Sequence, residues 1–226
     1  GQTLRSRVFV LLSKIAAHFS AGIIVKSEEM RACLLRGDRS RTKVIPNGVD
    51  FDHFRPFDSG EARRSLGLDP NRRYVLFPST PYEKRKRIDL AEQAMEHLAA
   101  EFPEAELLVV YHQPQEVLPT YMNACNVLLM TSDWEGSSNV VKEALACNLP
   151  VVTVDAGDAW SVTCGVEQCF QVARAPEKIA QGLAAVLRSG LRSDGRSRSS
   201  SLELSTIARS VVKLYLDGQV RRPCAA

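Results

Sequence analysis

The sequence predicts an α/β fold built on a doubly wound parallel sheet. From residue 74 onward, apolar runs of strand length alternate with amphipathic stretches of helix length. The strand candidates are continuous Val, Leu and Ile runs, which is typical of parallel strands covered on both faces. The composition, 45% hydrophobic and 24% charged over 226 residues, is that of an ordinary globular protein with one large or two modest domains.

The first part of the chain predicts a small unit followed by a linker. Residues 4–19 are expected to form a helix with one apolar face, made of Val8, Leu11, Leu12, Ile15 and Phe19. The run 22–27 is short and β-rich, and Ser27 is a suitable N-cap for a helix at 28–35. Residues 43–56 carry two prolines and an Asn-Gly dipeptide, so we expect a linker there rather than a helix or strand.

The rest of the chain alternates regularly. Strands are predicted at 74–79, 105–112, 126–132 and 149–155, with a weaker one near 169–172. Helices are predicted at 88–101, 116–124, 138–148 and 176–188. The Ser-, Arg- and Gly-rich stretch 188–201 is expected to be an exposed loop. A closing helix follows, with Ser200 and Glu203 at the spacing of a capping box.

Two glutamates mark the candidate site. Glu135 follows the predicted strand 126–132, and Glu143 lies inside the next predicted helix. In an open α/β sheet, ligands bind beyond the carboxyl ends of the strands, where helix N-termini favour phosphate. Eight helical residues rise by about 12 Å, which matches the span from the ribose to the sugar of a nucleotide sugar. Because carboxylates accept hydrogen bonds from paired hydroxyls, we expect the two glutamates to bind opposite ends of one ligand. A turn residue and a surface helix residue are the plainer interpretation.

A basic segment lies at the corresponding edge of the predicted sheet. Residues 82–89 read YEKRKRID and follow an earlier strand. Lys86 or Arg87 is suited to neutralise a diphosphate and to stabilise its departure. Taken alone, the same segment also fits an exposed basic loop that opens a helix. His112 is a candidate for the wall of a nucleotide pocket, and Trp134 for the wall of the ligand loop.

Other function classes receive less support from the sequence. A net charge of +3 is too small to indicate a nucleic-acid surface. The six cysteines form no C-x-x-C pair and no histidine spacing completes a zinc site, so a reducing, cytoplasmic setting without a metal site is the simpler interpretation. The Asp-Phe-Asp at 50–52 resembles a metal-binding signature but lies in the predicted linker. No apolar run approaches a membrane span. No G-x-G-x-x-G follows a predicted strand, which argues against a dinucleotide-dependent oxidoreductase.

Three stretches together resemble a known family. They are VIPNGVDFDHFRP at 44–56, EKRKRIDLAEQAM at 83–95, and SDWEGSSNVVKEALACNLPVV at 132–152 with DAGD at 155–158. They resemble the retaining GT-B glycosyltransferases of family 4, in the bacterial and archaeal polysaccharide or teichuronic-acid branch. The likeness extends from about residue 10 to 217. Its most specific part is the pair of glutamates with seven residues between them, followed by EALACNLPVV.

The resemblance implies a nucleotide-sugar donor, UDP- or GDP-linked, with no separate cofactor and no metal. Glu143 would hold the ribose hydroxyls, Glu135 would face hydroxyls of the donor sugar, and Lys86 would contact the diphosphate. Backbone amides of the intervening loop would meet the diphosphate and the sugar: Gly136, Ser137, Ser138, Asn139 and Val140. Transfer to a glycan or lipid-linked acceptor would retain the anomeric configuration, with Glu135 and Lys86 closest to the chemistry.

Two departures from the family pattern matter. Many relatives carry a Gly-Arg pair after the first strand of this domain, whereas residues 77–84 read FPSTPYEK. We therefore expect Arg85 or Arg87 to supply the second basic contact. The family also has two Rossmann-like domains with the reaction in the cleft between them, and this chain carries one complete domain.

The expected division of the chain follows from that second departure. It comprises a remnant of the N-terminal, acceptor-side domain at 1–45, an interdomain linker at 46–56, a donor-binding domain at 57–200, a closing helix at 201–217 and a tail at 218–226. Because the chain starts with Gly1 and half of the cleft is missing, we expect a fragment of a longer protein, or a subunit that needs a partner chain with the acceptor domain.

The uncovered segments lead to a further expectation. Self-association through 4–19 or the closing helix would cover the apolar face, and peripheral contact with a membrane surface is the other use of 4–19. Two alternative functions remain open. One is a non-catalytic nucleotide-sugar binding module, which would keep Glu135, Glu143 and Lys86. The other is a nucleotide-sugar epimerase on the same fold.

Overall fold

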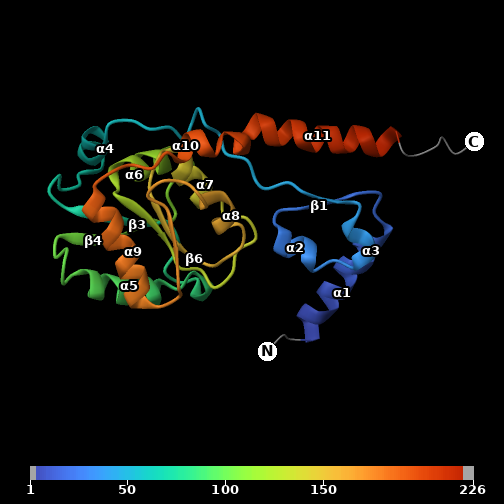
Figure 1. Ribbon diagram of the computed structural model, residues 1–226, viewed down its shortest axis with the longest axis horizontal. Helices are drawn as coiled ribbons and strands as arrows, with labels where there is room; N and C mark the ends of the chain where they lie inside the picture. Colours follow the sequence, from blue (N-terminus) through green and yellow to red (C-terminus); the bar gives the residue numbers. More distant parts are fainter. Residues whose placement is uncertain (1–3, 221–226) are drawn as a thin grey trace, which may run out of the picture.

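A five-stranded parallel sheet forms the centre of the protein in the computed structural model, which describes residues 4–220 (Figure 1). The strand order is β4-β3-β5-β6-β7. The strands are β3 (Arg73–Phe77), β4 (Ala105–Val109), β5 (Val127–Met130), β6 (Val151–Val154) and β7 (Phe170–Val172). They lie within or close to the predicted runs, so the doubly wound parallel sheet is confirmed. Most of the predicted tail, residues 221–226, lies outside the described residues.

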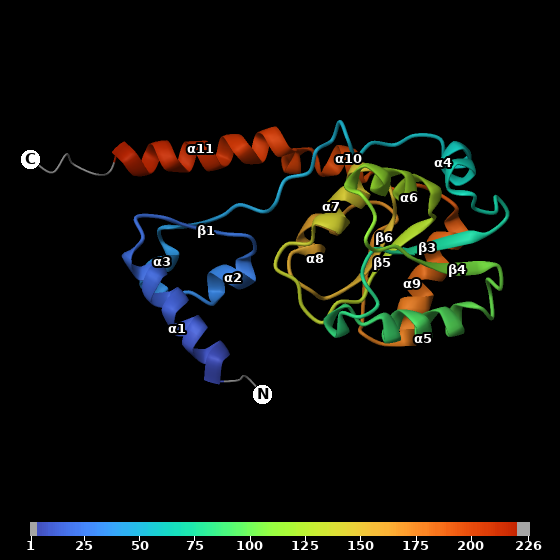
Figure 2. The same cartoon turned by 180° about the vertical axis from the view of Figure 1, so that it is seen from behind.

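Helices cover both faces of this sheet (Figures 1 and 2). One face carries α5 (Ile88–Leu98) and α9 (Pro176–Ser189), and the other carries α6 (Leu118–Ala124), α7 (Asn139–Ala146) and α8 (Ala159–Thr163). Successive strand residues belong to opposite clusters: Leu128 packs with the α7 side, and Leu129 with the α5 and α9 side. This alternation explains why the strands are apolar without interruption.

Short elements connect and flank these layers. They are α4 (Ser59–Leu66), η1 (Lys84–Lys86) and η2 (Gln115–Val117). The helix α4 lies outside every predicted helix, although its sequence carries both signals: the Asp58 carboxylate accepts the Glu61 amide at 2.7 Å, and Gly67 ends the helix at φ +67°.

The N-terminal segment forms a separate small unit (Figure 1). It comprises α1 (Leu4–Phe19), β1 (Ile23–Val25), α2 (Glu28–Ala32), α3 (Arg36–Arg39) and β2 (Thr42–Val44). The prediction that residues 43–56 are linker throughout is wrong at its start, because β2 pairs in parallel with β1. Thr42 and Val44 are β-branched, and the pairing ends before the proline at 46.

The apolar face predicted for α1 is present and uncovered within the described residues. Leu11, Leu12 and Phe19 are 59%, 54% and 83% exposed. No helix among residues 4–220 is long and apolar enough to cross a bilayer. Self-association through α1 stays a prediction.

The prediction of an exposed loop at 188–201 is right only in part. Residues 188–192 are exposed, but the segment also contains α10 (Gly195–Arg198) and η3 (Ser200–Leu202), and two of its arginines bind backbone carbonyls. Arg192 donates to the carbonyls of Cys125 and Cys147 at 2.8 and 3.0 Å, and Arg196 donates to the carbonyl of Phe54 at 2.8 Å. Arginine side chains in a polar segment need not be fully solvated when they have hydrogen-bond partners in the protein. Here the two guanidinium groups donate to carbonyls at the C-terminal ends of α6 and α7, which have no partner within their own helix.

The capping box predicted at Ser200 and Glu203 is also wrong. The closing helix α11 (Leu204–Val220) begins after Glu203, whose carboxylate accepts the amides of Ser205 and Thr206 at 3.1 and 3.3 Å. Ser200 belongs to the preceding 3₁₀ turn. From there α11 projects away from the sheet on the side of the N-terminal unit (Figure 2).

Candidate functional site

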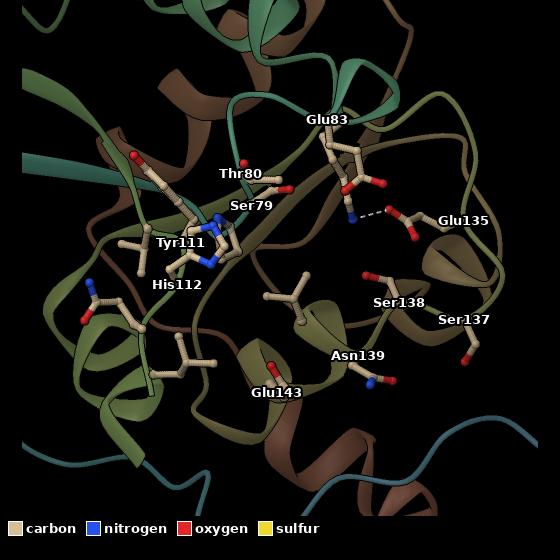
Figure 3. A pocket seen from close by; sticks show the side chains of 16 residues that line it. Ser79, Thr80, Glu83, Tyr111, His112, Glu135, Ser137, Ser138, Asn139 and Glu143 are labelled. Carbon is tan, nitrogen blue, oxygen red and sulfur yellow. Dashed lines mark hydrogen bonds and ion pairs between the residues drawn. The ribbon is translucent and has the colours of Figure 1, made fainter. Parts of the chain in front are cut away.

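A cavity of about 540 Å³ opens at the carboxyl ends of β3, β4 and β5, beside the start of α7 (Figure 3). This volume is in the range of sites that bind small molecules. Its walls come from the loops after three strands and from α7: Pro78, Ser79, Thr80, Glu83, Lys86, Val110, Tyr111, His112, Gln113, Leu118, Glu135, Ser137, Ser138, Asn139, Val140 and Glu143. The topology of the sheet therefore gathers side chains that are far apart in sequence at one edge.

The predicted residues Lys86 and Glu135 lie in contact on one wall. Lys86 Nζ is 2.6 Å from Glu135 Oε1, and Ser132 Oγ donates to the same oxygen at 2.8 Å. Burial alone would raise the pKa of Glu135, but the hydrogen bonds from Lys86 and Ser132 outweigh it and hold the pKa below its ordinary value. Glu135 is therefore a charged carboxylate with cations around it.

Of the two arginines proposed for the second basic contact, the structure brings only Arg85 to Glu135. Arg85 Nη1 lies 3.1 Å from Glu135 Oε1, and its guanidinium stacks 4.8 Å from the centre of the Trp134 ring. Arg87 lies at φ +55° and binds Asp89 at 2.8 Å and Asp133 at 3.2 Å. It is not among the residues that line the cavity.

Glu143 has the opposite electrostatic character from Glu135. It lies on α7, lines the cavity and is partly buried. Burial raises its pKa to about 7 from an ordinary value of 4.5, and the charges of His53 and Lys142 offset only part of this effect. In Figure 3, Glu143 lies away from Glu135, and Tyr111 and His112 lie on the far side of the cavity from Glu135.

The loop between the two glutamates is only partly helical. Helix α7 begins at Asn139, so the expectation of a continuous helical rise from Glu135 to Glu143 is wrong. Ser137, Ser138, Asn139 and Val140 line the cavity, whereas Gly136 faces α2, with the Met30 sulfur 3.7 Å from the position of a Cβ.

A buried ion pair beneath this loop was missed at the sequence level. Lys142 Nζ lies 2.7 Å from Asp158 Oδ2, with side-chain exposures of 0% and 6%. Asp158 Oδ1 accepts the amide of Ser138 at 3.0 Å, so this amide, which we expected to face a diphosphate, already has an anionic partner. A single lysine inside the apolar run VVKEALA is the sequence signal that points to a buried partner.

Of the other residues that line the cavity, the sequence analysis predicted some and missed others. His112 was a candidate, and it lies at φ +53°, a backbone conformation that is rare for residues other than glycine. Tyr111 was missed; its ring packs edge-on against Tyr82 at 6.3 Å between centroids. Asn47, from the predicted linker, donates to Asn139 Oδ1 at 2.8 Å and so connects the linker to the cavity wall.

The sequence of this chain is similar to those of known proteins. A model described as Glycosyl transferases group 1 matches residues 93–189, which include the cavity loops from β4 to α7. This stretch of the chain therefore resembles a group 1 glycosyltransferase domain. The chain is similar to the D-inositol 3-phosphate glycosyltransferase of Segniliparus rotundus, with 27% identity over 68% of this chain and 44% of the relative. It is also 26% identical to the lipopolysaccharide core biosynthesis mannosyltransferase LpsB of Rhizobium meliloti, over 79% of this chain and 58% of that protein.

Solved structures agree on the fold of this chain. Sucrose-phosphate synthase from Thermosynechococcus elongatus superposes with a TM-score of 0.80 at 22% identity, covering 96% of this chain and 63% of that one. Anabaena HepE in complex with UDP and glucose gives 0.71 at 20% identity, covering 93% and 66%. The five-stranded domain is thus the C-terminal half of a GT-B fold. The chain spans about half the length of the curated relatives it matches.

Proposed function

We propose that this chain binds the nucleotide-sugar donor of a glycosyltransferase and supplies the donor half of its active site. The observation that carries the proposal is one cavity that is lined by Lys86, Glu135 and Glu143, with Glu135 and Glu143 well apart in Figure 3. Arg85 lies directly behind this wall, 3.1 Å from Glu135. A paired cationic wall suits a diphosphate, and carboxylates suit the hydroxyl pairs on either side of it.

Each residue then has a defined role. Glu143 accepts hydrogen bonds from the ribose hydroxyls. These hydrogen bonds stabilise the charged carboxylate and so oppose the burial that raises the pKa of Glu143. Lys86 contacts the diphosphate, with Arg85 as the second cation. Glu135 accepts hydrogen bonds from the donor sugar while keeping Lys86 oriented.

The reaction we propose is sugar transfer with retention and without a metal. Lys86 and Arg85 stabilise the charge that develops on the leaving diphosphate, which is the task a divalent cation performs in other transferases. The diphosphate oxygen then orients the acceptor hydroxyl on the same face of the sugar. The acceptor, a glycan or lipid-linked sugar, would bind opposite this wall.

The names of relatives support the donor class. HepE has been solved with UDP-glucose, with a TM-score of 0.68, and LpsB is named as a mannosyltransferase of lipopolysaccharide core biosynthesis. We therefore propose a UDP- or GDP-linked hexose and a role in polysaccharide assembly, in the cytoplasm where such donors are made.

A second candidate function is a binding subunit. It rests on the same contacts, because Lys86, Glu135 and Glu143 are placed to hold a donor whether or not transfer follows. Product formation from a radiolabelled nucleotide sugar, with and without an acceptor-domain partner, decides between the two. Turnover in either mixture supports the transferase; binding without turnover in every mixture supports the subunit; no binding of any nucleotide sugar contradicts both.

A further inference from the structure

The buried pair of Lys142 and Asp158 has no role in the donor contacts described above, yet it is the most enclosed charge pair near the cavity. Lys142 has no solvent exposure, and its ammonium lies 2.7 Å from Asp158. A lysine in such a position is strongly unfavourable unless its charge is neutralised and its N–H groups are bound. The pair therefore has a strict geometry, because neither partner tolerates displacement of the other.

Asp158 holds two residues of the cavity wall, and Lys142 holds one of them as well. Asp158 Oδ2 accepts the Ser137 hydroxyl at 2.7 Å, and Oδ1 accepts the Ser138 amide at 3.0 Å. Lys142 also donates to the Ser137 hydroxyl oxygen. The segment that links Glu135 to α7 is thus fixed from below by three hydrogen bonds to one ion pair.

This arrangement also changes the electrostatics of the site. The carboxylate of Asp158 occupies the anion position at the start of α7, where a phosphate would otherwise be attracted. Because Lys142 neutralises Asp158, the pair contributes no net charge to the cavity. Diphosphate affinity then depends on Lys86 and Arg85, and the shape of the wall depends on the buried pair.

We propose that Lys142 and Asp158 are positioning residues that fix residues 137–139 for recognition of the sugar end of the donor. The inference rests on the proposed function. Loss of the pair lets the wall beside Glu135 move, so the sugar-bearing donor loses contacts. The nucleoside diphosphate, held by Glu143 and the cationic wall, keeps most of its affinity.

The test uses variants that separate geometry from a bare buried charge. Lys142→Met with Asp158→Asn removes both charges and keeps an acceptor for the Ser138 amide, so a melting midpoint near that of the wild type is expected. Lys142→Leu with Asp158→Asn, which also leaves no unpaired buried charge, is the second variant if the first double variant unfolds. The matched control is Arg188→Met with Glu101→Gln, a surface pair at 2.7 Å with exposures of 63% and 50%.

Calorimetry on the full chain measures binding of UDP, UDP-glucose, GDP and GDP-mannose. We expect the double variant to bind the sugar-bearing donor about tenfold more weakly and the matching diphosphate within about threefold of wild type, with the control unchanged. A folded variant with unchanged affinity for the sugar-bearing donor overturns the inference alone. Equal losses for both ligands show a merely structural role and also overturn it. Failure of the wild type to bind any of the four probes overturns the proposed function and the inference with it.

Discussion

The ammonium of Lys86 lies 2.6 Å from a carboxylate oxygen of Glu135, although 49 positions separate the two residues in the chain. Arg85 approaches the same oxygen at 3.1 Å and also pairs with Glu83. Two cations and two carboxylates thus form one cluster, of which Lys86, Glu83 and Glu135 line the cavity and Arg85 lies beside them. A diphosphate that enters competes with Glu135 and Glu83 for Lys86 and Arg85, so recognition of the donor includes rearrangement of this cluster.

The two glutamates are predicted to divide the donor between them. Glu143→Ala should weaken binding of the free nucleoside diphosphate by about tenfold or more, because a buried ribose contact is lost. Glu135→Ala should leave that ligand bound at least as tightly as in the wild type, since it frees Lys86 from a competing carboxylate, and should weaken only the sugar-bearing donor. Calorimetry with both ligands measures the difference. Equal losses in both variants for both ligands would rule out the division.

The two arginines beside Lys86 should differ in their effects. Arg85→Met removes a cation that contacts Glu135, and we expect about a tenfold loss of nucleoside diphosphate affinity. Arg87→Met removes a guanidinium that binds Asp89 and Asp133, and we expect diphosphate affinity within about twofold of wild type. Titration of each variant with the diphosphate measures this. A larger loss for Arg87→Met than for Arg85→Met would reverse the assignment.

The raised pKa of Glu143, about 7, makes stability depend on pH. The folded protein keeps this proton where the unfolded chain has released it, so stability is greatest below pH about 4.5 and falls as the pH rises through 7. The full cost is up to about 3 kcal/mol. Glu143→Gln cannot ionise, so it should melt above the wild type at about pH 8 and alike at about pH 4. The same difference in melting midpoint at both pH values would contradict a raised pKa.

Gly157 packs against the backbone of Glu135. It has φ +60°, and a Cβ there would lie 2.6 Å from the Glu135 carbonyl oxygen, whereas Gly165 at φ +78° has open space. Both alanine variants should lose about 1 kcal/mol to backbone strain, measured by urea unfolding. Only Gly157→Ala should also lose affinity for the sugar-bearing donor, because it displaces Glu135. Indistinguishable affinities in the two variants would show that this contact does not position the carboxylate.

The sequence was sufficient to predict the sheet and its main helices, because each of them has a hydrophobic pattern that is visible within a short stretch of sequence. The β5 run and the amphipathic pattern of α9 can be read in windows of a few residues, and so can the two glutamates at a strand-to-helix junction. The same windows explain the errors at 188–201. Arg192 and Arg196 look solvated by composition, and only the folded chain brings carbonyls of Cys125 and Phe54 to them.

The missed parts of the site depend on distant pairings. Nothing near Lys142 in sequence shows that its partner is Asp158, on the loop between β6 and α8. The sequence also does not show that Arg85 contacts Glu135 whereas Arg87 contacts Asp89 and Asp133. Local patterns therefore predicted the sheet edge at which the cavity lies, whereas charge partners across that edge required coordinates. The predicted domain boundaries and the self-association of α1 stay predictions.

The most direct measurement is a crystal structure of this chain with a nucleotide sugar bound. We predict the diphosphate within about 3 Å of Lys86 Nζ, the ribose hydroxyls on Glu143 and the sugar hydroxyls on Glu135. A donor bound outside this cavity, or one bound with both carboxylates turned to bulk water, would contradict the account.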